Sequence, residues 1–387
     1  MLTMSPMAKS PVGSPTVFFH IGPPKTGTTY IQDLLRHWRK ELRSVGVLYP
    51  GIPQYSHFSA ALDVRGDHGF GIGPGRETPR LAALGAWARL LRQTRGFRGT
   101  VVISHEIFAS ADDHHARAAI EDLHGTDLHL VVTARDPGRQ LVSSWQETIK
   151  HGSTRAFPAI ARRTIARDNL AVPQQIPELL ERWGSTLTPD HVHVVTVPPS
   201  GTDPKVLWER FATVIGVDGS RFDPSVVPRS NESLGIAEVE FLRRINLALA
   251  GRLPHPQYGA VATRLFANSI LADLSRSPKP VLPKHLWPAV ERLGDDWIEQ
   301  IKFRGYSVSG DLDDLRPRQR QPVSRNVATE EDIAEVAVQA TAELLLQLAQ
   351  TREPSVVARQ SIRNAASRTV AAALGAGRRL RLRRRQA

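Results

Sequence analysis

Residues 17–29 read VFFHIGPPKTGTT, an apolar run that leads through a glycine and two prolines into a segment rich in hydroxyl groups. The run over residues 17–21 has the length and apolar character of a buried strand, which Gly22 ends. After Thr28, an apolar stripe at helical spacing predicts a long amphipathic helix: Ile31, Leu34, Leu35, Trp38, Leu42 and Val45. The stretch therefore predicts a strand, a tight loop and a helix in direct succession.

The loop between this strand and this helix has the features of an anion-binding site. Amide groups without helical partners and the positive end of the helix dipole meet at a helix start, where they attract phosphate. Glycines allow a ligand to approach the backbone closely, and lysine and hydroxyl groups add donors. We therefore predict a phosphate-binding loop that consists of Pro24, Lys25, Thr26, Gly27, Thr28 and Thr29.

The spacing of this loop differs from that of a nucleoside-triphosphate loop. The triphosphate pattern is G-x-x-x-x-G-K-S/T, in which the lysine follows the second glycine directly. Here Thr28 has that position, and Lys25 lies two residues before Gly27. Two alternatives stay open at this point, a phosphotransferase with a degenerate triphosphate loop and a non-catalytic module that binds a nucleotide or a membrane.

Apolar runs and helical stripes alternate along the first two thirds of the chain. This alternation predicts an α/β three-layer fold, with a central parallel sheet and helices on both faces. From Leu234 onward we expect helices and no strand, and a helix capped by Thr329 and Asp332 forms a helical C-terminal extension. Residues 50–80 are expected to form a loop, either a lid or a simple surface loop. The expected strands are 101–104, 128–134 and 192–197, and the expected helices are 81–93, 110–123, 137–150 and 204–214.

The net charge of +12 is concentrated at one end of the chain. Residues 352–387 contain ten arginines and one acid, which leaves only +3 for the rest. We therefore expect no specific nucleic-acid partner. The Arg-rich tail is expected to be flexible, and it is either merely solvated or in weak contact with an anionic membrane.

Other features of the composition narrow the chemistry and the location. The chain has no cysteine, which excludes disulfides, thiolate metal sites and cysteine nucleophiles. We find no strong metal constellation and expect no metal. Residues 1–15 read as a flexible N-terminus without the apolar stretch of a signal peptide, and no run is long enough to span a membrane, so we expect a cytoplasmic protein.

A second segment suggests a partner for the loop. Residues 130–145 read LVVTARDPGRQLVSSW, in which Arg135 ends an apolar strand and Ser143 follows eight residues later. A helix that starts at Asp136 reaches Ser143 after two turns, about 10 Å along its axis, which an extended arginine can span. One phosphate group could therefore contact both Arg135 and Ser143.

Together the two segments resemble sulfotransferases that use 3′-phosphoadenosine-5′-phosphosulfate (PAPS), the carbohydrate and bacterial members in particular. The Pro-Lys-Thr-Gly-Thr-Thr loop is similar to the 5′-phosphosulfate loop of that family. Arg135, Pro137, Ser143 and Trp145 look like its 3′-phosphate motif, and the two motifs occur in the family's order, about one hundred residues apart. The resemblance covers about residues 16–215.

The resemblance implies a P-loop-like sulfotransferase domain over residues 16–316, followed by the helix 329–351 and the tail 352–387. It implies transfer of a sulfonate group from PAPS to a hydroxyl or amine of a carbohydrate or small molecule, without a metal. In the family, the loop lysine and the hydroxyl residues surround the 5′-phosphate and the sulfonate, while the arginine and the serine hold the 3′-phosphate. Lys25 could place its ammonium at the departing oxygen, whose charge is the main catalytic demand.

The acceptor must also lose a proton, which requires a base. Ser104-His105-Glu106 follows a predicted strand, at the edge of the sheet where open α/β folds bind ligands. Cytosolic members use a histidine near this strand end, whereas glycosaminoglycan members use a glutamate after the first helix, where this chain has His57. We favour Glu106, then His105, then His57, and the choice stays open.

Overall fold

The computed structural model of the chain describes residues 14–51, 56–66, 83–165, 175–227, 233–318 and 327–350. The expected Arg-rich tail 352–387 and all but the last two residues of the expected flexible N-terminus lie outside these ranges. So does most of the glycine-rich part of the expected loop 50–80.

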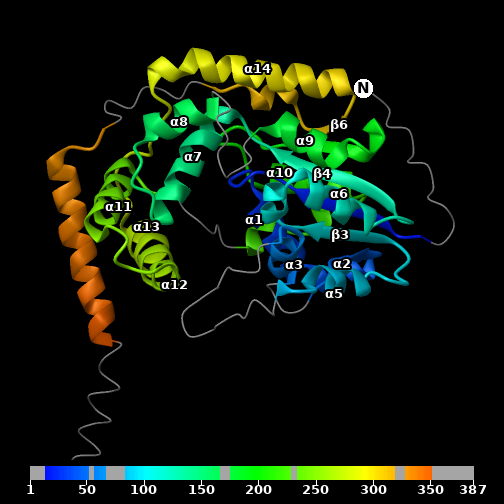
Figure 1. The fold of residues 1–387 in the computed structure, drawn as a ribbon, viewed down its shortest axis with the longest axis horizontal. Helices are drawn as coiled ribbons and strands as arrows, with labels where there is room; N and C mark the ends of the chain where they lie inside the picture. Colours follow the sequence, from blue (N-terminus) through cyan, green and yellow to red (C-terminus); the bar gives the residue numbers. More distant parts are fainter. Residues whose placement is uncertain are drawn as a thin grey trace, which may run out of the picture.

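Six parallel strands form the central sheet in the order β2-β3-β1-β4-β5-β6 (Figure 1). The strand β1 lies between β3 and β4, with His20 opposite Ser104 and Ile21 opposite Val132. This register brings the segments that follow β1, β3 and β4 to the same edge of the sheet. The strands are β1 Thr16–Ile21, β2 Val47–Leu48, β3 Thr100–Ser104, β4 Asp127–Ala134, β5 Val192–Thr196 and β6 Ser307–Ser309.

Helices cover both faces of this sheet, which confirms the predicted α/β three-layer fold. The α-helices are α1 Thr28–His37, α2 Arg39–Ser44, α3 Ser56–Val64, α5 Ala86–Arg92, α6 Asp113–Glu121, α7 Pro137–Lys150, α8 Phe157–Ile165, α9 Ile176–Gly184, α10 Lys205–Val214, α11 Ile236–Leu249, α12 His255–Tyr258, α13 Leu271–Leu274 and α14 Trp287–Arg304. A π-helical segment, Gly259–Ile270, links α12 to α13. Short 3-10 turns are η1 Glu106–Ser110, η2 Pro189–His191, η3 Gly219–Arg221, η4 Pro224–Val226, η6 Lys284–Leu286 and η7 Leu312–Leu315.

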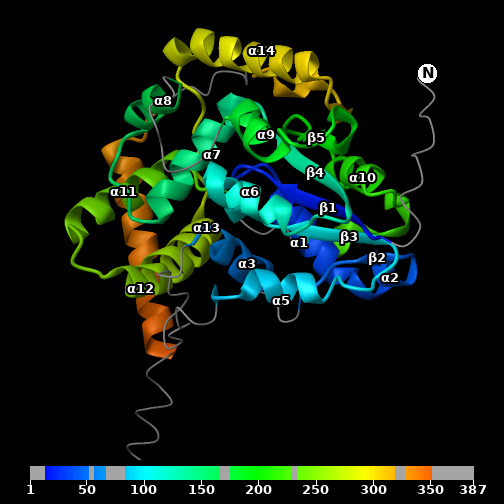
Figure 2. The same ribbon diagram turned by 45° about the vertical axis from the view of Figure 1, so that its right-hand side comes forward.

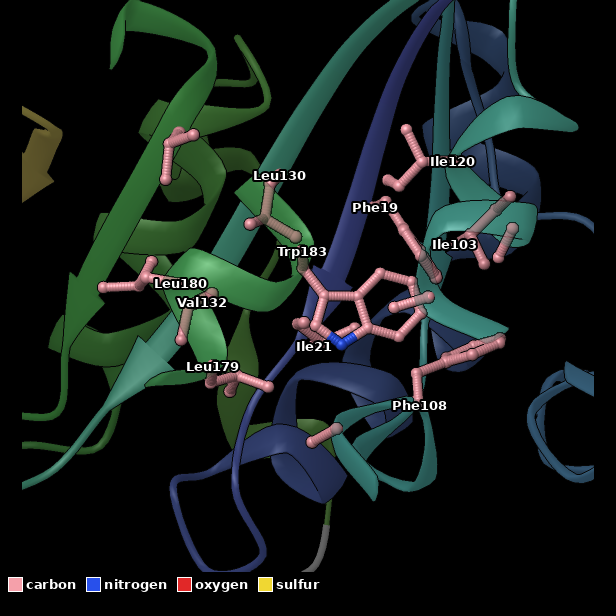
Figure 3. Packing of buried hydrophobic residues seen from close by; sticks show 14 of the residues in the cluster. Phe19, Ile21, Ile103, Phe108, Ile120, Leu130, Val132, Leu179, Leu180 and Trp183 are labelled. Carbon is pink, nitrogen blue, oxygen red and sulfur yellow. The ribbon is translucent and has the colours of Figure 1, made fainter. Parts of the chain in front are cut away.

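Alternate residues of the strands feed two separate cores, as a pleated strand requires. On one face, Phe19 and its neighbours pack under α3, α5, α6, α9 and α14. The indole of Trp183 from α9 lies across this face, with its ring centroid 5.1 Å from that of Phe19 and 6.4 Å from that of Phe108 (Figure 3). On the other face, Phe18 packs under α1, α2 and α10. Both faces of the sheet are therefore buried, which leaves the ends of the strands as the places where a ligand can bind.

A third apolar cluster lies beside the sheet and joins α7, α8, α11 and α13 to the helix over residues 330–350. The latter helix lies next to α11 in both views (Figures 1 and 2), and Arg244 of α11 forms an ion pair with Glu330, 2.7 Å between Nη1 and Oε2. Thr329 and Asp332 cap it reciprocally, as the sequence predicts: the amide of Asp332 donates to the Thr329 hydroxyl, and the amide of Thr329 donates to the Asp332 carboxylate.

Several expectations about single elements were wrong. The predicted long first helix is broken at Trp38 into α1 and α2, because the indole of Trp38 turns to the Asp223 carbonyl and packs against Phe222. The helix expected from Ser110 begins at Asp113, because the Asp112 carboxylate accepts from the His115 amide and so caps it. The expected loop 50–80 contains α3.

Two edge strands also escaped the sequence analysis. The strand β6 contradicts the expectation of no strand after Leu234, and β2 was not expected either. Both are two or three residues long, which is too short for an alternating pattern to show. Within the described ranges, none of the helices combines the length and the apolar character that a bilayer crossing requires.

Candidate functional site

The loop that follows β1 is held in a tight shape by its own side chains and by β4. The Thr26 hydroxyl is fully buried, donates to the Pro23 carbonyl and lies 2.9 Å from the Thr133 hydroxyl of β4. A Cβ on Gly22 would lie 2.3 Å from the same Thr133 oxygen, so only glycine fits there. The side chain of Thr26 therefore shapes the loop and faces the sheet.

The loop has positive φ angles on both sides of Thr26, and this conformation is strained at Lys25, which is not a glycine. Lys25 has φ 73°, in the left-handed region that non-glycine residues seldom occupy, and Gly27, directly before α1, has φ 86°. Strain of this kind persists where surrounding structure enforces it, and it is concentrated at functional sites. The loop therefore delivers Lys25, Gly27, Thr28 and Thr29 to the wall of one small cavity.

Arg135 connects this loop to the second predicted motif. Its Nη1 donates to the Lys25 carbonyl oxygen at 3.0 Å and to the Ser143 hydroxyl at 3.2 Å. Asp136 caps α7 by accepting from the Arg139 amide at 2.9 Å, which sets the direction in which Ser143 emerges. The structure thus brings together two motifs that are 110 residues apart in sequence.

The cavity between the two motifs has a volume of about 210 Å³ and is strongly charged. Its described walls carry three cationic side chains, from Lys25, Arg135 and Lys150, and one carboxylate, from Glu147. The Lys25 ammonium lies 2.6 Å from the Glu147 carboxylate. Burial by itself would raise the pKa of Glu147, but the charge and hydrogen bond of Lys25, together with the charges of His151 and Lys150, lower that pKa. An excess of positive charge in a confined space favours an anionic ligand.

Lys150 is a buried lysine on the wall of this cavity. Its side chain is buried, and burial lowers its pKa, as do the charges of Lys25 and Lys279, while Glu147 opposes the shift. The sequence analysis did not single out Gln146, Glu147 or Lys150. The signal was nevertheless present, because these residues follow Ser143 at helical spacing and so continue its face of α7.

Glu106 is separated from this cavity by the hydroxyl group of Thr28. The Gln32 side-chain amide donates to its Oε2 at 2.8 Å, and the Thr28 hydroxyl, on the cavity wall, also hydrogen-bonds to it. Burial would raise the pKa of Glu106, but His105 and the hydrogen bonds from Gln32 and Thr28 together lower it. Glu106 is therefore an ionised carboxylate fixed next to the start of α1.

Each of the two histidines considered as alternative bases already accepts a hydrogen bond at Nδ1. His57 donates from Nε2 to the Pro50 carbonyl at 2.6 Å and accepts at Nδ1 from the Ser104 amide at 3.3 Å. Burial lowers the pKa of His57 to about 3, so the ring is neutral and acts as a brace between β3 and α3. His105 accepts at Nδ1 from the Ile107 amide and caps η1. Among the three candidates, Glu106 is the one whose partners reach the cavity wall.

A second, larger cavity of about 780 Å³ adjoins the first and shares Arg135, Ser143, Gln146 and Ser233 with it. Its walls combine an apolar surface with cationic side chains. Trp145 belongs to the apolar part and packs against Phe157, 5.4 Å between ring centroids. The apolar group is Val142, Trp145, Phe157, Ile236, Leu282 and Trp287, and the cationic group is Arg135, Arg139, Arg243, Arg244, Lys279, Lys284 and Arg318.

Comparison with known proteins adds little to this description. No family model and no curated protein matches the chain. Among solved structures, a sulfotransferase domain from the Synechococcus PCC 7002 olefin synthase is similar, with 14% identity and a TM-score of 0.33 over 78% of this chain and 99% of that one.

Proposed function

We propose that this chain is a sulfotransferase that moves a sulfonate group from PAPS to a hydroxyl or amine of a carbohydrate or small-molecule acceptor. The observation that carries the proposal is the hydrogen bond from Arg135 to the Lys25 carbonyl, which joins the two motifs at one cationic cavity. PAPS carries anionic groups at both its 5′ and its 3′ position. A site with cations at two adjoining ends suits such a ligand better than a ligand with one chain of phosphates.

Each motif then has a defined task. The loop residues Pro24 to Thr29, with the amides at the start of α1, hold the 5′-phosphate and the sulfonate. Arg135 and Ser143 hold the 3′-phosphate, because a guanidinium and a hydroxyl at 3.2 Å from each other can donate to the same anion. The adjoining cavity of about 780 Å³ has the size of a small-molecule site and offers room for the remainder of the two substrates.

In the proposed reaction, the acceptor oxygen or nitrogen attacks the sulfur in line with the bond to the 5′-phosphate. As the new bond to sulfur forms, the old sulfur–oxygen bond breaks, and its electron pair stays on the departing phosphate oxygen. The Lys25 ammonium offsets the charge that develops on this oxygen. The acceptor gives its proton to the Thr28 hydroxyl, which passes its own proton to the Glu106 carboxylate that it hydrogen-bonds. Glu147 holds the Lys25 ammonium in the cavity before the substrate arrives.

The pH profile of the reaction provides a test of Glu106. A base must be deprotonated, so activity falls as the pH drops through its pKa, and the lowered pKa of Glu106 keeps this acid limb below the usual range of a glutamate. Replacement of Gln32 by alanine removes a hydrogen bond that favours the charged form, and we expect the acid limb of kcat/KM to shift to higher pH. The profile of the variant is measured between pH 3 and 9.

Two companion variants make this experiment decisive. Glu106→Gln should lose most of its activity at every pH, because no carboxylate is left to titrate. His57→Gln should keep the position of the acid limb. If Gln32→Ala leaves the limb in place, or if Glu106→Gln retains full activity, another group is the base.

The proposal as a whole is tested by nucleotide binding. We expect calorimetry to show that 3′-phosphoadenosine-5′-phosphate binds without magnesium, and that it binds more tightly than ATP does with or without magnesium. Incubation with labelled PAPS and an acceptor library, read out by mass, then identifies the product. ATP binding as tight as that of the 3′,5′-bisphosphate would contradict the proposal and favour a phosphotransferase with a degenerate triphosphate loop.

A further inference from the structure

A cluster of histidine and aspartate side chains lies at the amino ends of β4 and β5. The candidate active site lies at the other end of the strands, where β1, β3 and β4 end. Asp127 is the first residue of β4, and His129 follows on the same face of that strand. His191 ends the turn η2, and His193 lies in the adjacent strand β5. These groups come from two segments 64 residues apart. No part of the proposed sulfonate transfer uses them.

The distances within the cluster match those around a single metal ion. His191 Nε2 lies 3.1 Å from Asp127 Oδ1, and His129 Nε2 lies 3.5 Å from Asp127 Oδ2. The ligand atoms of the three residues all lie within 4.8 Å of one another. With metal–ligand bonds of 2.0–2.2 Å, two tetrahedral ligands of one zinc ion are about 3.4 Å apart. The His129 and His191 rings are stacked, with 4.3 Å between centroids and 16° between planes, so the partly exposed His191 ring has to turn before both Nε2 lone pairs meet one ion.

Further contacts orient the three side chains toward a common point. His129 Nδ1 is 2.9 Å from His193 Nε2, and the Thr16 hydroxyl donates to Asp127 Oδ2 at 3.1 Å. His191 Nδ1 is 3.2 Å from the Asp190 carboxylate, so this imidazole is flanked by carboxylates at both nitrogens. Metal-binding histidines characteristically use the second ring nitrogen in this way, which fixes the tautomer and the ring direction. Both Nε2 atoms thus face the Asp127 carboxylate.

The charge of the cluster also suits a cation. Burial, together with the neighbouring His191, lowers the pKa of His129, and burial with His129 and His191 lowers that of His193 to about 4. These two rings are therefore neutral near pH 7, which is the form that binds metals. Burial would lower the pKa of His191, but its contacts with Asp190 and Asp127 raise it, so protons compete with a metal for His191 as the pH falls.

We propose that Asp127, His129 and His191 form a binding site for one divalent transition-metal ion of the zinc class. Each imidazole binds the ion through the Nε2 lone pair and keeps its single proton on Nδ1. Where His191 is protonated, it releases its Nε2 proton to solvent, and the Asp127 carboxylate stays ionised. The partly exposed side of His191 leaves the fourth coordination position open to water. His193 serves as a positioning residue that holds His129 through its Nδ1. A bound ion links the start of β4 to the segment that leads into β5. It takes no part in the proposed sulfonate transfer.

The test is a titration of the untagged full-length chain, first stripped of metal, with zinc in a calorimeter. We expect one zinc ion per chain in the wild type, and ligand-field absorption typical of four-coordinate cobalt when Co²⁺ replaces Zn²⁺. His191→Ala removes a partly exposed ligand and should weaken zinc binding at least about tenfold. Asp127→Asn, which keeps the shape of the side chain, should have a similar effect.

A matched control is available on the surface of α6. His115 lies 2.8 Å from the Asp112 carboxylate and so forms a histidine–aspartate pair on a different element from the proposed site. His115→Ala should bind zinc as the wild type does. The proposal is overturned if the wild type shows no stoichiometric zinc binding, or if His191→Ala and Asp127→Asn bind zinc as tightly as the control does. Circular dichroism verifies that each variant is folded before its affinity is compared.

Discussion

Lys25→Ala should lower kcat for sulfonate transfer by about 100- to 1,000-fold, the effect of removing one preorganised donor to a developing oxyanion. The reason is geometric as well as electrostatic. Lys25 projects from a strained loop into the small cavity, where its ammonium forms an ion pair with Glu147 and Arg135 holds its carbonyl. The measurement is the single-turnover rate with labelled PAPS, which separates chemistry from product release.

Two controls separate the loss of the ammonium from damage to the fold. Lys205→Ala removes a lysine that is 55% exposed and lies 3.9 Å from the Asp203 carboxylate, and it should leave the rate unchanged. Lys25→Ala also leaves Glu147 without its partner, so the double variant with Glu147→Gln shows whether the stranded carboxylate contributes to the loss. The melting temperatures of both Lys25 variants should lie within a few degrees of the wild-type value. Normal turnover by Lys25→Ala would remove the catalytic role of this residue.

The sequence predicted the parts of the site that depend on short-range order. A strand, a glycine-containing loop and a helix that follow one another directly can adopt few arrangements, so the loop from Pro24 to Thr29 could be located from sequence alone. The same holds for Arg135 and Ser143, because the helix that starts at Asp136 fixes their separation. The structure places Nη1 of Arg135 3.2 Å from Oγ of Ser143, and binding of one anion by both residues stays a prediction.

The remainder of the site depends on contacts between distant segments, which single residues do not encode. Glu106 was favoured as the base, but its link to the cavity runs through Gln32 and Thr28 of α1, and the sequence gives no sign of that contact. His57 looked available, yet the Pro50 carbonyl and the Ser104 amide occupy both of its nitrogens.

The metal cluster has the same origin in long-range pairing. Asp127 and His129 are two residues apart, a spacing that occurs throughout soluble proteins, and His191 approaches them only because β4 pairs with β5. Acids and histidines are contiguous in the sequence at residues 112–115. In the structure, Asp112 of that segment caps α6. The proximity of Asp127, His129 and His191 therefore follows from the order of the strands in the sheet and not from any contiguous stretch of sequence.

Arg135→Gln should abolish most of the preference for a nucleotide that carries a 3′-phosphate. Hydrogen bonds to charged groups contribute about 1.5–3 kcal/mol, which corresponds to about a 12- to 150-fold change in affinity. We therefore expect the affinity for 3′-phosphoadenosine-5′-phosphate, relative to that for AMP, to fall by this factor in the variant. Calorimetric titration of both nucleotides at one salt concentration measures the ratio.

The ratio is the informative quantity because Arg135 has two roles in the structure. Its Nη1 donates to the Lys25 carbonyl as well as to Ser143, so its removal also disturbs the 5′ loop. AMP binds through the loop without a 3′-phosphate and therefore reports that disturbance alone. Arg304→Gln, which removes an arginine that is 51% exposed and paired with Glu181, should change neither affinity. If Arg135→Gln weakens both nucleotides equally, Arg135 shapes the loop and another group binds the 3′-phosphate.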